Sequence, residues 1–444
     1  MKTEKTASGE NPIPNRVLIL ASKMGYQTRG FADAAEKLGV SVVFGTDRCH
    51  QLDDPWGDQA LALHFERPRE AAEEIAQALM KNPVSAVIAL GDRPTPAAAY
   101  AAQTLGIRGN PPESAEICRN KLRQREALRA AGIRVPDFLA LSASSGLSEV
   151  LQGVKFPCVL KPLSLAASQG VIRANDAKEF ERAVKRIRAL LESPEIQVTR
   201  EPDLDRLLVE NYIPGREVAL EGLIDKGRLR VLAIFDKPDP LEGPYFEESI
   251  YVTPSRLPAD MQIAIEECAA AAVRALKLAT GPVHAEFRVN DEGPWVLEIA
   301  PRPIGGLCSR ALRFGPADST ATKISLEELL LRHALQLEGS DLMREESPSG
   351  VMMIPVPRSG IFEGVDGIES AEKIPGVTEI RMTARLRDYV AAWPDGASFL
   401  GFIFACGDSP AFVENALRAA HANLKFRFSP RLAVENPATG RIGA

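Results

Sequence analysis

The sequence predicts a mixed fold, α/β and α+β, with a parallel α/β domain at the N-terminal end and a small α+β domain at the C-terminal end. Near the N-terminus, apolar runs alternate with helical stretches, which is typical of a parallel sheet covered by helices. A longer middle part ends in a hairpin pattern at residues 284–299, and a polar linker at 339–350 precedes a last group of strands. With 444 residues, the chain is long enough for two or three domains with full-sized cores.

The N-terminal domain is assigned to residues 1–118. Apolar strands are predicted at 16–21, 42–45 and 86–90, and each ends in a polar loop. In parallel sheets, ligands bind beyond the carboxyl ends of the strands, so these loops are candidate substrate-contact loops. For any single residue in them, the simpler explanation is a solvated turn.

The middle domain is assigned to residues 119–338. Asn120 and Lys121 interrupt its first helical stretch, and Ser325 and Glu328 form a capping box for its last helix. The elements predicted in and just before this domain are helices at 112–128, a strand at 157–161, a helix at 177–191, strands within 207–224 and at 230–235, a helix at 260–278, the hairpin, and a helix ending at 337.

The C-terminal domain is assigned to residues 350–430. Its helix is capped by Ser409, and residues 431–444 form a tail without a packing signal. The predicted elements are strands at 351–356, 378–382 and 399–404 and a helix at 410–424.

Two glutamates in the hairpin predict a metal site. If the turn is a three-residue loop with Gly293 at a positive φ, Asn290 faces Pro294, and Glu286 then lies directly opposite Glu298. Their Cβ atoms would lie roughly 5 Å apart, where like charges repel unless a cation separates them. A hard divalent cation is the simplest occupant.

An arginine follows the second glutamate on the same two-residue alternation, since Glu298, Ala300 and Arg302 share it. Mg²⁺ binds a few carboxylate oxygens and completes its shell with phosphate and water, and a guanidinium stabilises developing negative charge. The pattern therefore indicates phosphate chemistry. The alternative is that both glutamates are ordinary solvent-side residues of a surface hairpin.

A lysine and a loop of small residues form a second candidate site. A short buried strand ends at Lys161, and the loop 164–171 follows it. Gly170 in this loop lets backbone amides approach an anion, which suits the phosphates of a nucleotide. The alternative is an exposed lysine beside a plain turn.

Composition and missing motifs exclude several classes. The net charge of −6 argues against nucleic-acid or anionic-membrane partners. No GxGxxG follows the first strand and no GxxxxGK[ST] occurs, so a Rossmann dinucleotide site and a Walker P-loop are poorly supported. The sequence has neither a signal-peptide core nor an apolar run of membrane-spanning length, and we expect a cytoplasmic protein.

The six cysteines are scattered without CxxC pairs, which fits reduced thiols better than disulfides or a zinc site. No base is placed beside Cys308 by the sequence, so a catalytic thiol is poorly supported. The cysteines are Cys49, Cys118, Cys158, Cys268, Cys308 and Cys406.

Four features in one order carry a resemblance. Lys121 begins a helix, Lys161 precedes a small-residue loop, a VENYIPGRE turn spans 209–217, and acidic residues lie on a closing hairpin. This order resembles the ATP-grasp superfamily of carboxylate–amine ligases. The resemblance covers nearly the whole chain and implies an ATP-grasp fold for residues 119–338, preceded by the α/β domain that accompanies it.

The resemblance implies a role for individual residues. Lys121 and Lys161 would contact ATP phosphates, with Lys161 also near the adenine pocket, and Ser168 and Gly170 would belong to the loop over them. Arg302 would stabilise the acyl phosphate and the tetrahedral state. The remaining implied roles are the adenine amino group for Glu210, the adenine ring edge for the backbone of Ile213, the ribose for Glu217, and Mg²⁺, with Mn²⁺ as the alternative ion, for Glu286 and Glu298.

One departure from the superfamily pattern concerns the metal. Many members have Asn two residues after the second metal glutamate, where this chain has Ala300. The tracts HAEFRV, PRPIGGLCSRALRF and DKPDPLEGPYFEESIYVTPS resemble the bacterial L-amino-acid ligases, which often show this change. Glu247, Glu248 and His284 would then face amino-acid substrates, with His284 as a catalytic candidate. A hydrogen-bonded structural histidine explains His284 about as well.

The resemblance implies a reaction. The γ-phosphoryl group of ATP passes to a carboxylate, an amine attacks the acyl phosphate, and ADP and phosphate are released. The expected partners are small-molecule carboxylates and amines, with amino acids foremost, and a homodimer. The alternatives are a ligase with another acceptor (an amino sugar, a polyamine or bicarbonate) and an ATP-binding module without turnover. A biotin carboxylase is poorly supported, since the chain lacks a Met-Lys-Met carrier motif.

Overall fold

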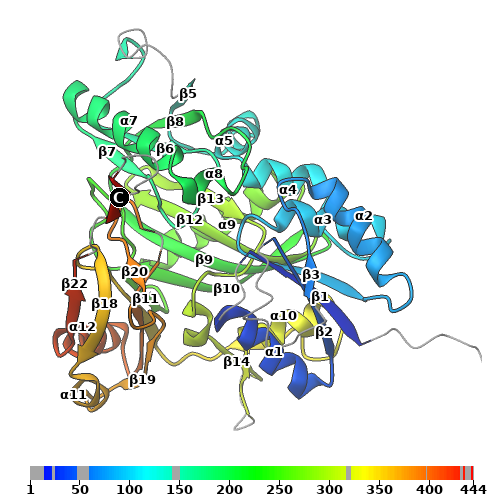
Figure 1. The fold of residues 1–444 in the computed structure, drawn as a ribbon. Helices are drawn as coiled ribbons and strands as arrows, with labels where there is room; N and C mark the ends of the chain where they lie inside the picture. The colour runs from blue at the N-terminus through cyan, green and yellow to red at the C-terminus, as the bar shows by residue number, and fades with distance from the viewer. Residues whose placement is uncertain are drawn as a thin grey trace, which may run out of the picture.

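The computed structural model describes residues 15–22, 26–47, 60–142, 151–316, 322–396, 398–430, 434–435 and 442–443. A parallel sheet from the N-terminal part lies beside a large antiparallel sheet, and a small sheet covered by helices lies above the large one (Figure 1). None of the helices in these ranges combines the length and the apolar character needed to span a membrane. Cys49 and most of the predicted tail lie outside the described residues.

The N-terminal sheet has the order β3-β2-β1-β4, and all of its pairs are parallel. The central strand β1 is almost fully buried, which explains its continuous apolar sequence. The prediction of a parallel sheet is confirmed, while the very short β3 was not predicted. The elements are β1 (Arg16–Ala21), α1 (Tyr26–Leu38), β2 (Ser41–Thr46), β3 (Ala60–Ala62), α2 (Pro68–Leu79), β4 (Ala86–Leu90) and α3 (Thr95–Thr104).

The central sheet has eight strands in the order β13-β12-β9-β10-β11-β17-β21-β19. Strands from the C-terminal small domain thus continue the sheet formed by the middle part of the chain. Its strands and principal helices are β9 (Arg216–Asp225), β10 (Arg228–Lys237), β11 (Ile250–Thr253), α9 (Ala259–Ala275), β12 (Gly281–Asn290), β13 (Gly293–Ala300), α10 (Leu326–Ala334), β17 (Ser349–Ile354), β19 (Val377–Met382), β21 (Gly401–Cys406) and α12 (Pro410–Ala422).

Alternation along these strands separates two faces. On β9, Val218, Leu220 and Ile224 join the core that contains α9. Glu217 and Glu221 alternate with these residues and point to the opposite face, as the two-residue period of a strand requires. That opposite face carries the candidate site.

The hairpin of β12 and β13 pairs Glu286 with Glu298, as predicted, but by a different route. The turn has two residues rather than three, so Asn290 faces Gly293 instead of Pro294. A bulge beside Leu297 then shifts the register by one residue and restores the pairing of the glutamates. Gly293 has φ +102°, as the sequence predicted.

A small antiparallel sheet of order β5-β8-β6-β7 forms the layer that we call the lid. Helix α7 packs on it through Phe180, Val184 and Ile187. The side chain of Asn120 caps α5 by accepting hydrogen bonds from the backbone N–H groups of Leu122 and Arg123, which explains the predicted break. The elements are α4 (Pro112–Arg119), α5 (Lys121–Ala130), β5 (Phe138–Ser142), β6 (Cys158–Pro162), β7 (Ile172–Ala174), α7 (Ala177–Leu191), α8 (Pro194–Gln197) and β8 (Arg206–Asn211).

The C-terminal small domain adds a second sheet of order β20-β18-β22 beside the extended central sheet. The predicted strand at 399–404 begins two residues later, at Gly401, and Ser409 caps α12 as predicted. The further elements are η2 (Cys308–Ala311), β14 (Arg313–Gly315), β15 (Ile324–Ser325), β16 (Met343–Arg344), β18 (Gly360–Asp366), α11 (Ile368–Glu372), β20 (Tyr389–Val390), β22 (Lys425–Ser429), β23 (Val434–Glu435) and β24 (Ile442–Gly443).

Candidate active site

Two adjoining cavities lie between the lid and the central sheet. The first, which we call the lid cavity, contains nearly all of the predicted nucleotide contacts. The second, the inner cavity, lies toward the C-terminal domain and has a volume of about 270 Å³. Both cavities are lined by Ala166, Ala167, Ser168, Glu286 and Glu298. The small-residue loop and the two glutamates therefore form the boundary between them.

The lid cavity brings together most of the residues predicted from the sequence. Among the predicted nucleotide contacts, Gly170 is the exception, because it lines neither cavity and its N–H donates to the carbonyl of Pro394 (3.2 Å). The predicted residues that line the lid cavity are Lys121, Lys161, Ser168, Glu210, Ile213, Glu217, Glu286 and Glu298.

The lysines of the lid cavity are held in defined positions. Lys121 donates to the carbonyl of Leu165 (2.6 Å), and its Nζ lies 4.0 Å from Oε1 of Glu298. Lys161 Nζ lies 2.6 Å from Oε2 of Glu210, which is almost completely buried. Lys121 therefore contacts the loop at the cavity boundary, and Lys161 contacts Glu210 on another wall of the lid cavity.

Glu210 also forms an ion pair with Arg125, which is not among the predicted site residues. Burial raises the pKa of the Glu210 carboxyl, but Arg125 and Lys161 outweigh burial and lower the pKa to about 2. Arg125 lies on the helix that Asn120 caps, and no local motif marks it as a partner of a strand residue.

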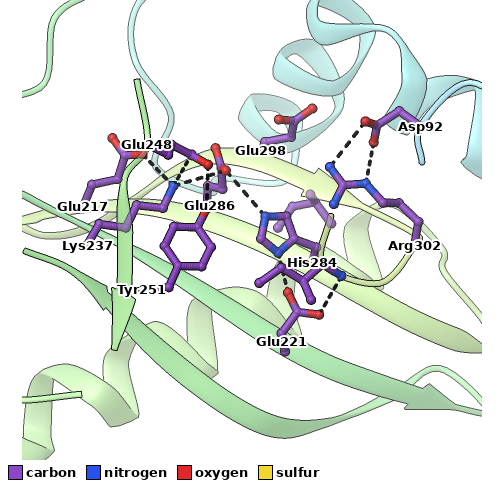
Figure 2. Close-up of polar contacts among 12 residues, drawn as sticks. Asp92, Glu217, Glu221, Lys237, Glu248, Tyr251, His284, Glu286, Glu298 and Arg302 are labelled. Atoms are coloured by element: carbon purple, nitrogen blue, oxygen red, sulfur yellow. Dashed lines mark hydrogen bonds and ion pairs between the residues drawn. The ribbon is translucent and has the colours of Figure 1, made fainter. Parts of the chain in front are cut away.

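Lys237 is the main site residue that the sequence did not reveal. Its Nζ lies 2.8 Å from Glu217, 2.5 Å from Glu248 and 3.2 Å from Glu286 (Figure 2). Burial lowers the pKa of this lysine, but the three carboxylates together raise it well above its usual value. Tyr251 completes the group, because its hydroxyl donates to Glu248 (2.7 Å).

The carboxylates of the site fit a hard divalent cation. Glu286 and Glu298 face each other across the hairpin at the boundary of the two cavities. In addition, Glu217, Glu248 and Glu286 offer oxygens that lie within 4.8 Å of one another. Carboxylate oxygens are the ligand type that Mg²⁺ prefers. Ala300, which lies opposite His284 in the ladder, brings no ligand atom.

His284 lines the inner cavity, but both of its ring nitrogens face carboxylates. Nδ1 bonds to Glu221, and Nε2 lies 3.5 Å from Glu286. Burial lowers the pKa of the imidazole, but Glu221 and Glu286 outweigh burial and raise the pKa to about 9. The other oxygen of Glu221 accepts from the backbone N–H of Ile304 (3.1 Å). This geometry favours the alternative of a hydrogen-bonded structural histidine over a proton-transfer role.

Arg302 reaches the inner cavity and forms a two-point ion pair with Asp92, at 2.9 and 3.3 Å (Figure 2). Asp92 follows strand β4, so one of the predicted contact loops of the N-terminal sheet does lie at the site. Burial opposes ionisation of both groups, but their mutual attraction raises the pKa of Arg302 and lowers that of Asp92 to about 2. The pair fixes the plane of the guanidinium.

Three family models match this chain. They are an ATP-grasp N-terminal domain over residues 32–109, an ATP-grasp domain over 154–311, and an L-amino acid ligase C-terminal domain over 352–429. The chain contains an ATP-grasp domain preceded by an ATP-grasp N-terminal domain. The resemblance that the sequence carried is therefore confirmed, and the lid and the central sheet together form the ATP-grasp fold.

Several known proteins resemble the chain over most of its length. The crystal structure of an L-amino acid ligase from Bacillus licheniformis is 27% identical, has a TM-score of 0.79, and covers 94% of this chain and 100% of that one. An alanine–anticapsin ligase from Bacillus amyloliquefaciens is 26% identical over 63% of this chain and 62% of its own length. An uncharacterized protein from Sinorhizobium fredii is 26% identical over 74% and 65%, so the chain spans under two thirds of either of these two relatives.

The ATP-grasp lid is tied to the C-terminal domain in this structure. Gln169 donates to the carbonyl of Asp395 (3.0 Å), next to the contact between Gly170 and Pro394. Arg186 on α7 forms a two-point ion pair with the Asp395 carboxylate, at 2.8 and 3.0 Å. One turn of the C-terminal domain thus holds both the loop and the helix of the lid.

Proposed function

We propose that this chain is an ATP-dependent carboxylate–amine ligase that joins two amino acids and releases ADP and phosphate. The observation that carries this proposal is the boundary between the two cavities, where Glu286 and Glu298 face both. A phosphoryl group bound on the lid side and a carboxylate bound on the inner side would meet there. The match of residues 352–429 to an L-amino acid ligase domain supports amino acids as substrates.

On the lid side, we assign ATP to the cavity. Lys121 and Lys161 would neutralise its phosphates, Ser168 would lie in the loop over them, and the base and ribose would lie along Glu210, Ile213 and Glu217. Both glutamates already form ion pairs, so their positions are fixed before the nucleotide binds. Glu210 pairs with Arg125 and Lys161, and Glu217 pairs with Lys237 and Arg288.

Glu286 and Glu298 are the residues that would hold Mg²⁺ or Mn²⁺. When bound there, the ion supplies positive charge to phosphate oxygens during phosphoryl transfer. Lys237, held among three carboxylates, contacts Glu286 at this boundary and adds a fixed positive charge.

On the inner side, Arg302 is the residue placed to stabilise negative charge on the reacting carboxyl group. A carboxylate resists attack by an amine, whereas an acyl phosphate has a good leaving group, and the tetrahedral state that forms carries an oxyanion. Asp92 holds Arg302 at two points, so little reorganisation is needed when this charge develops. The lid over the boundary would exclude water from the acyl phosphate.

The test is phosphate release from MgATP against single and paired amino acids. We expect release that depends on an amino-acid pair and is lost in Glu298→Gln. Glu292→Gln, an exposed position in the turn of the same hairpin, is the matched control and should keep wild-type activity.

Two alternatives remain as outcomes of this test. Phosphate release with another amine, such as an amino sugar or a polyamine, would keep the ligase chemistry and change the acceptor. ATP binding without release on any mixture would favour an ATP-binding module without turnover and contradict the proposal.

A further inference from the structure

The inner cavity has a charged end and an apolar end. The charged groups that line it are each paired, as Glu286 is with Lys237, Arg302 with Asp92, and His284 with Glu221. The apolar end is formed by Met353, Trp393 and Phe399. In the central sheet, three strands separate β12, which carries Glu286, from β17, which carries Met353.

The apolar end is a packed wall. The rings of Trp393 and Phe399 stack with centroids 5.0 Å apart, and Phe399 contacts Phe402 edge-on at 6.3 Å. Trp393 and Met353 are buried, although both border the cavity. Side chains held in this way present a defined apolar surface.

We propose that this wall receives the side chain of one amino-acid substrate and selects a large, uncharged, apolar side chain. The inference rests on the proposed ligase function and names the substrate class of the same site. A side chain seated on Trp393, Phe399 and Met353 would leave water for an apolar surface, which is favourable in proportion to the area buried. A charged side chain there would lose its hydration, and every charged group that lines the cavity in the described part of the chain already has a partner.

The same turn also holds the lid. Trp393 borders the cavity, while Pro394 and Asp395, the next two residues, bind Gly170, Gln169 and Arg186 of the lid. A substrate side chain packed on Trp393 would support the turn that keeps the lid closed. Discrimination between side chains should therefore appear in kcat as well as in KM.

The experiment measures kcat and KM for phosphate release, with products identified by mass spectrometry. Leucine, methionine and phenylalanine are compared with glycine, aspartate and lysine, each paired with a common second amino acid in both orders. We expect the wild-type kcat/KM for the apolar set to exceed that for the other set by about 10-fold or more at one position of the product.

The variants separate side-chain selection from a structural role. Trp393→Ala should reduce kcat/KM by about 10-fold for the large apolar substrates and by less than about threefold for glycine. Trp393→Phe keeps an aromatic ring and should recover most of the loss. Phe412→Ala removes a partly exposed ring of the same domain that lines neither cavity, and it should leave the profile unchanged.

Three outcomes would count against the inference. A wild-type preference for charged or small side chains would overturn it, and this result needs no variant. An equal loss for all substrates in both Trp393 variants would reduce the wall to a structural role. If no amino-acid pair is turned over, the proposed function is contradicted. If the enzyme then ligates other carboxylates, it is a ligase but the proposed substrate class is wrong.

Discussion

The two ends of the inner cavity are built by different parts of the chain and by different forces. At the charged end, Glu286 and Arg302 come from β12 and the loop after β13, and each lies beside an opposite charge. At the apolar end, Trp393 and Phe399 come from the C-terminal domain and pack through their rings. Removing one member of a buried ion pair leaves the other uncompensated, whereas apolar contacts weaken in proportion to area. Substitutions at the charged end should therefore cause large losses of stability or activity, and substitutions at the apolar end smaller ones.

The largest effect is expected for Lys237→Met. The change leaves three carboxylates close together without their shared cation, so we expect a loss of about 3–5 kcal/mol in unfolding free energy by urea denaturation. Mg²⁺ should raise the thermal midpoint of this variant more than that of the wild type. Lys226→Met, in the exposed turn between β9 and β10, is the control. A variant as stable as the wild type would show that this lysine does not hold the acidic cluster together.

Arg302→Lys should lower kcat by about 100-fold or more, because a lysine cannot form the two-point contact with Asp92 or present a fork to an oxyanion. The measurement is steady-state phosphate release with the best amino-acid pair. Arg310→Lys, at a partly exposed arginine paired with Glu379, serves as the control. Wild-type kcat in Arg302→Lys would contradict the role given to the guanidinium.

Glu210→Gln should change the pH dependence of stability. The folded-state pKa of about 2 lies below the ordinary 4.5, so the ionised carboxylate stabilises the fold above pH 4.5, and this contribution is lost as the pH falls toward 2. The difference corresponds to about 3 kcal/mol. Denaturation across this pH range should show a flatter acid limb for the variant. Glu195→Gln, exposed on α8, should keep the wild-type slope, and an unchanged slope in Glu210→Gln would contradict the assignment.

The smallest effect is expected where the lid meets the C-terminal domain. The pair of Arg186 and Asp395 is about half exposed, so its loss should cost under about 1 kcal/mol. We expect Asp395→Asn to raise ATP hydrolysis without product measurably, by up to about fivefold, because water reaches the site more often. Asp388→Asn, exposed in the same domain, is the control. Unchanged coupling of hydrolysis to product would argue that the turn does not hold the lid.

Much of the fold follows from local signals in the sequence. The buried strands of the N-terminal sheet are continuous apolar runs, and Asn120, Ser325 and Ser409 each mark a helix start by a capping interaction. Capping involves residues two or three apart, so the sequence displays it directly. Strand β3 has only three residues and carries no such pattern.

The site was only partly predictable because two bulges set its register. Counting back from the turn at Lys226 and Gly227 would place Lys237 opposite Arg216, but a bulge after Val231 moves it opposite Glu217. A bulge likewise pairs Glu286 with Glu298, although a longer turn without a bulge would give the same pair. Bulges leave little mark in the sequence, and a one-residue shift changes every cross-strand partner.

Contacts between distant segments were the other hidden part. Asp92 and Arg302 lie 210 positions apart, and no local pattern pairs them. In the sequence, Asp92 belongs to a predicted loop at a strand end, and Arg302 follows the predicted metal glutamates. Only the packing of the N-terminal sheet against the central sheet brings them together.

Phosphoryl transfer to a carboxylate at the boundary of the two cavities can be followed with an amino acid whose carboxylate carries isotopically heavy oxygen. We expect one heavy oxygen in the released phosphate, because the acyl phosphate breaks at its acyl carbon when the amine attacks. Heavy oxygen found in AMP, or phosphate released without any label while product forms, would contradict phosphoryl transfer to the carboxylate.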